Sequence, residues 1–169
     1  MATIWNLDPT HSEITFSVKH MMISKVKGNF NTFSANIESE DDSFKNAKVS
    51  ANVETASIDT NNTDRDAHLK SEDFFNVEKN PEIKFEATSL NGDITGNLTI
   101  NGITKPVVLD VDFGGIGQDP WGNTKAGFSF DGKIKRSDFG LNWNAALEAG
   151  GVLVSDEVKI AGELQFVKA

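Results

Sequence analysis

The chain contains no cysteine and no tyrosine among its 169 residues. The lack of cysteine excludes disulfides, thiolate catalysis and cysteine-ligated zinc or iron–sulfur centres. The lack of tyrosine beside 12 phenylalanines predicts buried rings that need no hydroxyl partner. No apolar run approaches the roughly 20 residues of a membrane helix, so we expect no integral membrane segment.

Positive charge is scarce as well. The chain has 16 lysine and arginine residues against 25 aspartate and glutamate residues, which gives a formal net charge of −9 at pH 7. Such a field repels phosphate backbones, so we expect no nucleic-acid partner. The amino-terminus shows neither a basic n-region nor an apolar h-region, and this lack of a secretory signal favours the cytoplasm.

The composition that remains is typical of one folded domain. Hydrophobic residues make up 38% of the chain, enough to bury a substantial core. No linker, repeat or low-complexity segment interrupts it. We therefore expect a single domain over residues 1–169.

The stretch from Trp5 to His20 carries the clearest strand signal. It reads W-x-x-D-x-x-H-S-x-I-x-F-x-V-x-H. Ile14, Phe16 and Val18 alternate with polar residues, as in a strand with one apolar face. His20 has the parity of this apolar row, and a polar group among apolar side chains needs a partner or a role.

Similar alternation recurs along the rest of the chain. Strands are predicted at residues 13–20, 29–38, 47–55, 82–90, 92–100, 106–113, 127–136 and 157–167. Asn101-Gly102 predicts a tight hairpin, and Asn91-Gly92 is a second such signal. Strands spaced this closely pair antiparallel, and about eight of them can form either a closed barrel or a two-sheet sandwich.

Helical signals are few. Asn62 or Thr63 can cap a short helix that runs to Lys70. A further helical turn is expected at residues 71–74 and a third helical stretch near residues 21–25. Residues 114–117, Gly-Gly-Ile-Gly, are predicted to form a loop rather than a phosphate cradle.

The three histidines, His11, His20 and His68, are the candidates for metal binding or acid–base chemistry. His11 and His20 lie an odd number of positions apart, so on one continuous strand they face opposite sides. The chain contains no H-E-x-x-H and no G-x-S-x-G motif. We expect no metal site, and local bracing of a turn or helix is the simplest interpretation of each histidine.

Residues 14–37 contain no aspartate or glutamate, although the whole chain is acidic. Lys19, Lys25 and Lys27 lie in this stretch with His20. Two interpretations stand: a positive mouth for an anionic or polar head group, or a solvated lysine face.

The opening motif resembles that of the YceI-like family of lipid- and polyisoprenoid-binding proteins. Further motifs follow in the family's order: Ser57-Ile58-Asp59-Thr60, Arg65-Asp66-x-His68-Leu69, Phe74-Phe75 with Pro81-x-Ile83-x-Phe85, Gly96-x-Leu98-Thr99-Ile100-x-Gly102-Ile103-Thr104-Lys105-Pro106-Val107, Arg136-Ser137-Asp138-Phe139-Gly140 and Asp156-Glu157-Val158-x-Ile160. Each motif is weak alone, but together they span nearly the whole chain.

The resemblance implies an all-β fold, a lipocalin-like antiparallel barrel of about eight strands with one or two short helices. It implies a protein that carries or stores a long-chain isoprenoid or related amphiphile without catalysis, needs no cofactor and can form a homodimer. Many family members work in the periplasm. This chain starts at the mature motif, which again favours the cytoplasm.

The same resemblance suggests a site. Its apolar part is expected to comprise Trp5, Ile14, Phe16, Val18, Phe30, Phe85, Phe128 and Phe130. The polar end of the ligand is expected to meet His20, Arg65 and His68. No residue is predicted to be catalytic.

Two other functions remain open at this stage. One is an enzyme that acts on a prenyl or lipid substrate with a histidine as its acid or base. The other is a stress-related structural barrel whose core is packed shut. Phenylalanine rings fill a core as readily as they line a cavity, so the large phenylalanine count does not decide between a carrier and a closed barrel.

Overall fold

A computed structural model describes residues 3–20, 24–72, 74–141 and 154–169, with only the backbone described for His20, Val154 and Ser155. The described strands are β1 (Thr3–Leu7), β2 (Glu13–His20), β3 (Ser24–Phe30), β4 (Phe33–Ser39), β5 (Ala47–Glu54), β6 (Ile58–Asp59), β7 (Glu82–Ala87), β8 (Gly92–Ile100), β9 (Ile103–Gln118), β10 (Thr124–Lys135) and β11 (Val154–Lys168). The described helices are α1 (Thr63–Lys70) and the short 3-10 helices η1 (Pro9–His11), η2 (Thr55–Ser57) and η3 (Arg136–Phe139).

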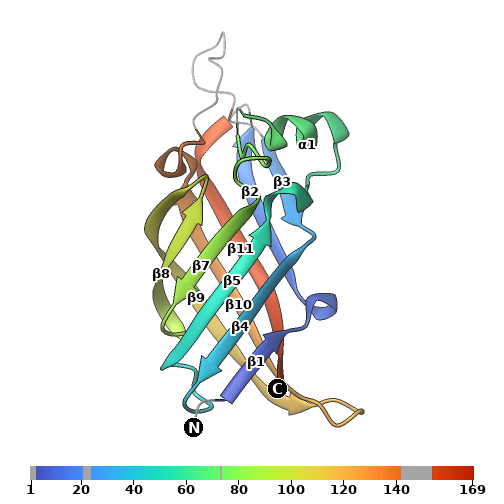
Figure 1. Ribbon diagram of the computed structural model, residues 1–169, viewed down its shortest axis with the longest axis vertical. Helices are drawn as coiled ribbons and strands as arrows, with labels where there is room; N and C mark the ends of the chain where they lie inside the picture. The colour runs from blue at the N-terminus through green and yellow to red at the C-terminus, as the bar shows by residue number, and fades with distance from the viewer. Residues whose placement is uncertain (1–2, 21–23, 73, 142–153) are drawn as a thin grey trace.

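Within these residues, eight strands close into an antiparallel barrel (Figure 1). Their order around the ring is β1-β4-β5-β7-β8-β9-β10-β11, and the pairing of β11 with β1 closes it. β2 pairs with the part of β11 that precedes its pairing with β1, and β3 and β6 continue the sheet beyond β2. The predicted barrel of about eight strands is therefore confirmed, and the two-sheet sandwich is excluded.

The wall bends where two long strands are interrupted. η1 separates β1 from β2, and Asn31 and Thr32 separate β3 from β4. The continuous strand predicted over residues 29–38 is wrong at this second break. The Asn31 N–H donates to the carbonyl of Ser57 (3.1 Å) and Thr32 accepts from the N–H of Glu54 (3.0 Å). These bonds turn the chain toward η2.

Turn chemistry explains one predicted hairpin and corrects the other. Asn101 and Gly102 have φ angles of 57° and 75°, so the tight turn between β8 and β9 is confirmed. At the second site only Gly92 has a positive φ, 85°. The side chain of Asn91 instead donates to the carbonyl of Ser43 (2.8 Å), which ties this turn to the β4–β5 loop.

Three local predictions are wrong, two of them because sheet pairing places the residues in strands. Ser24 and Lys25 belong to β3, so a helix at residues 21–25 is wrong there, while residues 21–23 lie outside the described chain. Residues 114–117 belong to β9 rather than to a loop. Gly127 pairs with Gly115 and Phe128 with Phe113, which leaves Gly114 as a β-bulge. The described residues among 71–74 form bends and turns rather than helix.

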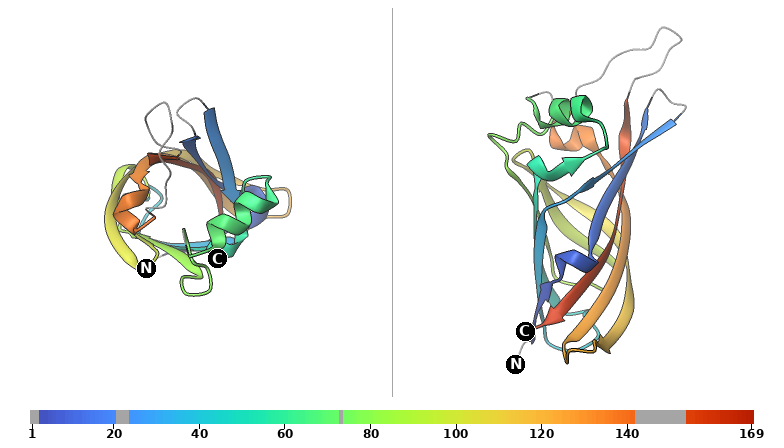
Figure 2. Two further views of the ribbon diagram at one scale, coloured as in Figure 1. Left: turned by 90° about the horizontal axis from the view of Figure 1, so that it is seen from above. Right: turned by 90° about the vertical axis from the view of Figure 1, so that its right-hand side faces the viewer.

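Helix α1 begins as its sequence predicts. The side-chain oxygen of Asn62 accepts a hydrogen bond from the backbone N–H of Arg65 at 3.0 Å, as expected of an N-cap. The helix lies over one end of the barrel, which we call the helix end (Figures 1 and 2). Both chain termini lie at the opposite end, which we call the termini end (Figure 1).

The inward rows of the strands form two hydrophobic clusters. At the termini end, Phe44 contacts Trp5, Phe113 and Phe128 with ring centroids 4.9 to 5.5 Å apart. At the helix end, Phe30, Phe75 and Phe139 are among the buried residues. Phe85 packs against both clusters, so the two are joined through the middle of the barrel.

Candidate functional site

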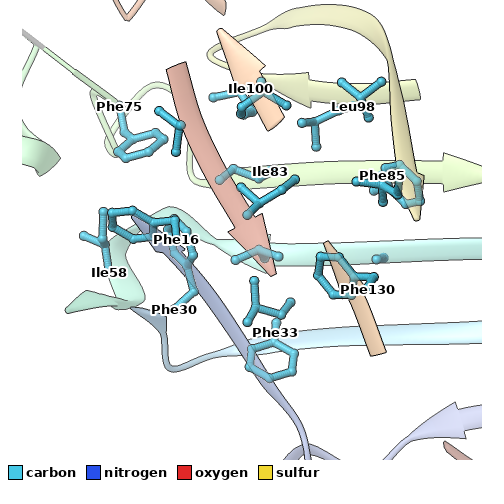
Figure 3. A pocket seen from close by; sticks show the side chains of 18 of the residues that line it. Phe16, Phe30, Phe33, Ile58, Phe75, Ile83, Phe85, Leu98, Ile100 and Phe130 are labelled. Carbon is cyan, nitrogen blue, oxygen red and sulfur yellow. The ribbon is translucent and has the colours of Figure 1, made fainter. Parts of the chain in front are cut away.

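The barrel encloses a cavity of about 610 Å³. Its wall is built from the inward-facing, mostly aliphatic and phenylalanine side chains of several strands (Figure 3). Because successive side chains of a strand point to opposite faces, the apolar rows read from the sequence become this inner wall. A cavity of this size lies within the range of small-molecule and lipid pockets, about 300–1,000 Å³.

The structure places most of the predicted apolar residues in the cavity wall. Ile14, Phe16 and Val18 reach it from β2, and Phe30 reaches it from β3. The other predicted wall residues come from other strands of the ring, Phe85 from β7 and Phe128 and Phe130 from β10. Strands far apart in sequence thus converge on one space.

Trp5 lies elsewhere. Its side chain is 1% exposed and sits in the aromatic cluster of the termini end, with its ring centroid 5.5 Å from that of Phe44. It is not part of the cavity wall. β1 pairs with β4 and β11 at this end, where the Trp5 side chain meets packed rings, whereas Leu7, two residues further along the same strand, lines the cavity.

The polar wall residues gather at the helix end. Asn62, Asp64, Arg65 and His68 come from α1 and its cap, and Asn62 and Asp64 are also exposed to solvent. The cavity therefore reaches the surface beside α1. Arg65 and His68, both predicted for the polar end, are brought together on this helix. The side chain of His20 lies outside the described part of the structure.

Arg65 is held in a fixed orientation. Its Nε donates to the Thr60 hydroxyl and its Nη2 to the Thr60 carbonyl, both at 2.7 Å. Thr60 is buried, and its hydroxyl and N–H in turn donate to Asp66 Oδ1 at 2.5 and 2.9 Å. A charged side chain fixed in this way forms a preorganised cationic group at the edge of the cavity.

His68 contacts the apolar wall beside it. Its ring meets Phe74 edge-on, with centroids 5.1 Å apart and an interplanar angle of 84°. Phe74 also lines the cavity. His68 therefore combines a bracing contact with a position at the cavity edge.

A second cation, Arg136, was not predicted for the site. It lies on η3, is only 6% exposed and lines the cavity. Its Nη1 donates to the carbonyl of Leu141 at 2.6 Å. Burial lowers the pKa of the Arg136 guanidinium, and the negative charge of Asp156 opposes that shift. In the sequence, an isolated arginine in a short helix shows no periodicity that would place it in the cavity wall. The only signal for Arg136 was therefore the motif Arg136-Ser137-Asp138-Phe139-Gly140.

His11 belongs to a different part of the molecule. Its Nδ1 lies 2.8 Å from Asp8 Oδ2, at the interruption between β1 and β2. Ser12 Oγ donates to the Asp8 carbonyl at 2.7 Å and accepts from the N–H of Gln165 at 2.9 Å. Since the serine oxygen is engaged by backbone and His11 lies outside the cavity wall, this group braces the break in the wall.

No group of three histidine, aspartate or glutamate side chains in the described residues is placed to hold a metal ion. No described helix is both long and apolar enough to span a bilayer.

A closed antiparallel ring around an apolar cavity defines a lipocalin-like β-barrel. The sequence profile of the YceI-like domain matches residues 5–166. A UPF0312 protein of Staphylococcus epidermidis is 39% identical over 166 residues, which is 97% of each chain. The chain belongs to the YceI-like family.

Solved structures agree with this assignment. The YCEI protein of Campylobacter jejuni is 35% identical, with a TM-score of 0.76 over 89% of this chain and 90% of that one. A polyisoprenoid-binding domain from Saccharophagus degradans is 14% identical, with a TM-score of 0.68 over 98% of both chains. This second likeness concerns the fold alone.

Proposed function

We propose that the barrel binds a long-chain isoprenoid or a related amphiphilic lipid in its cavity, and carries or stores it without chemical change. The observation that supports this most is the cavity of about 610 Å³ with its almost wholly apolar wall. The similar domain from S. degradans is described as polyisoprenoid-binding, which is consistent with the proposal.

Burial of the ligand chain supplies the binding energy. Each methylene group removed from water contributes roughly 0.8 kcal/mol. A chain of several isoprene units therefore gains on the order of 10 kcal/mol before the cost of ordering it is subtracted. No catalytic group is required, and the network around His11 serves the wall rather than the cavity.

We place the polar end of the ligand at the helix end. Arg65 and His68 stand at the cavity edge, where Asn62 and Asp64 reach solvent. An anionic or strongly polar head group would meet the fixed guanidinium of Arg65 there. His20 remains a sequence-based candidate for the same end, and the cytoplasmic location and homodimer remain predictions of the sequence.

The cavity is tested by filling it. Ala51 lines the cavity from β5, whereas the next residue, Asn52, faces solvent on the same strand. Ala51→Trp should reduce the affinity for a fluorescent polyprenyl probe at least tenfold, and Asn52→Trp should leave it unchanged. Probe titration of the two purified variants measures this. Equal affinities for the probe would contradict binding inside the barrel.

The polar end is tested by removing one charge. Arg65→Met should weaken binding of a polyprenyl phosphate more than binding of the corresponding hydrocarbon. Lys70→Met is the matched control, because Lys70 lies on the same helix but not in the cavity wall. An equal loss for both ligands in Arg65→Met would contradict the placement of the head group.

A further inference from the structure

Three phenylalanines of the cavity wall each lie over a glycine of the neighbouring strand. Phe16 of β2 is directly opposite Gly28 of β3, and Phe130 of β10 is directly opposite Gly162 of β11. Phe85 of β7 lies over Gly96 of β8, next to its register partner Leu98. All three rings line the cavity.

Each ring occupies the space that a side chain at the glycine would need. A Cβ at Gly28 would stand 2.5 Å from Phe16 Cζ, and a Cβ at Gly96 would stand 2.3 Å from Phe85 Cζ. At Gly162 the distance to Phe130 Cε1 would be 2.3 Å. Real Cβ atoms essentially never approach closer than 3.0 Å. The rings are therefore folded against the wall rather than extended across the lumen.

Backbone conformation does not explain these glycines. None of Gly28, Gly96 and Gly162 has a φ in the left-handed region. Glycine otherwise weakens a strand interior, and often marks a place where another group approaches closely. The requirement here is space on the inner face of the wall.

The pairs are distributed along the cavity. Phe16 packs against the cluster of the helix end and Phe130 against that of the termini end, while Phe85 contacts both. Figure 3 shows the three rings set apart around the same space. The lumen is thus widened at successive levels rather than at one point.

We propose that Gly28, Gly96 and Gly162 set the bore of the cavity, and that this bore admits the methyl branches of an isoprenoid chain. The inference rests on the proposed function and adds what selects the ligand. A straight acyl chain has a smaller cross-section than a methyl-branched chain. Narrowing the bore should therefore penalise the branched chain more.

Gly28→Ala is the sharpest test. The nearest atoms to its added Cβ are side-chain atoms of Phe16 and Thr60, whereas Gly96 and Gly162 each also face a carbonyl oxygen at 2.8 Å. The alanine methyl group should therefore push the Phe16 ring into the lumen and press on the Thr60 methyl group, without a backbone atom among its nearest contacts. Gly117→Ala is the matched control, because no atom lies within 4 Å of the added Cβ.

The measurement is the ratio of two affinities, for a polyprenyl alcohol and for a straight-chain alcohol of the same main-chain length. Gly28→Ala should lower the branched-to-straight ratio about tenfold, and Gly117→Ala should leave it unchanged. Adding Phe16→Leu to Gly28→Ala should restore the ratio, because the smaller side chain clears the lumen. A purely structural role of Gly28 would lower stability without moving the ratio.

The outcomes separate the two proposals. If the unaltered protein binds both alcohols and Gly28→Ala keeps its ratio, the bore proposal is overturned and the binding function stands. If the unaltered protein binds neither alcohol, both are overturned. If Gly28→Ala does not fold, Phe16→Trp narrows the cavity at the same position while Gly28 is kept. The same fall in the branched-to-straight affinity ratio is expected, and an unchanged ratio would overturn the proposal.

Discussion

The two ends of the barrel use the same inward rows of apolar residues for different purposes. At the termini end the rings pack on one another: Phe113 and Phe128 are stacked at 5.2 Å, and Phe44 meets both edge-on. Toward the helix end, rings such as Phe16 face a cavity, and the edge of that cavity carries Arg65 and His68. One end is a packed core and the other faces open space, and Phe128 belongs to both, because it packs in the core and also lines the cavity.

A loop residue makes this difference. Phe44 lies between β4 and β5, is fully buried, and has a φ of 60°. Left-handed backbone is unfavourable for a bulky residue and persists only where the surroundings hold it. Here the N–H of Leu90 donates to the Phe44 carbonyl at 2.8 Å and three aromatic rings surround the side chain. Phe44 therefore fills the interior of the barrel at the termini end.

Truncating one ring of the packed core and one ring of the cavity wall gives the largest expected contrast. Phe44→Ala should lower the free energy of unfolding by about 3–5 kcal/mol, because it leaves a void in a packed cluster. Phe130→Ala should cost only about 1–2 kcal/mol, because Phe130 is half-buried and already borders the cavity. Urea unfolding of both variants measures the difference. Equal losses would mean that the cavity wall is packed like the core.

The sequence predicts the inner wall better than it predicts its division into core and cavity. Alternation places Ile14, Phe16 and Val18 on the inner face, and Asn101-Gly102 and the Asn62 cap are read correctly from local chemistry. Trp5 is misplaced because alternation does not reveal what stands opposite an inward residue. That depends on Phe44, a loop residue distant in sequence.

Other features depend on pairing partners that no local pattern contains. The bulge at Gly114 arises from the register of β9 against β10. Arg136 enters the cavity wall because η3 folds over the helix end, and no periodicity marks it. The spaces over Gly28, Gly96 and Gly162 likewise depend on cross-strand neighbours.

Asp8, at the break between β1 and β2, provides a second, smaller effect. Hydrogen bonds from the Thr10 side chain, His11 and Lys125 hold the pKa of the Asp8 carboxyl group well below its usual value of 3.8. Asp8→Ala should lower the free energy of unfolding at pH 7 by about 2 kcal/mol, as expected for hydrogen bonds to a charged group.

The pH dependence checks the cause. A carboxylate with a lowered folded-state pKa stabilises the protein above its unfolded-state pKa, and this contribution is lost as the pH falls through the folded-state pKa. The gap between Asp8→Ala and the unaltered protein should therefore be constant above about pH 5 and shrink progressively below about pH 4. Thermal unfolding across this range measures the gap. A gap that does not change with pH would assign the loss to packing instead.

The smallest effect is expected for Trp5→Phe. Trp5 is buried in the aromatic cluster, and its Nε1 has no hydrogen-bond partner among the described residues. A buried, unpaired donor costs about 1–3 kcal/mol, so its removal offsets the loss of ring area. The free energy of unfolding should change by less than about 1 kcal/mol. A loss as large as that of Phe44→Ala would show that the indole, rather than Phe44, closes this end.

Native mass spectrometry of the protein purified from cells tests the central claim, an occupied lipid cavity bordered by a packed end, most directly. We expect a non-covalent adduct with the mass of a polyprenyl or related lipid on the unaltered protein and on Asn52→Trp, and no adduct on Ala51→Trp. Bare protein that also takes up no hydrophobic dye would contradict the account.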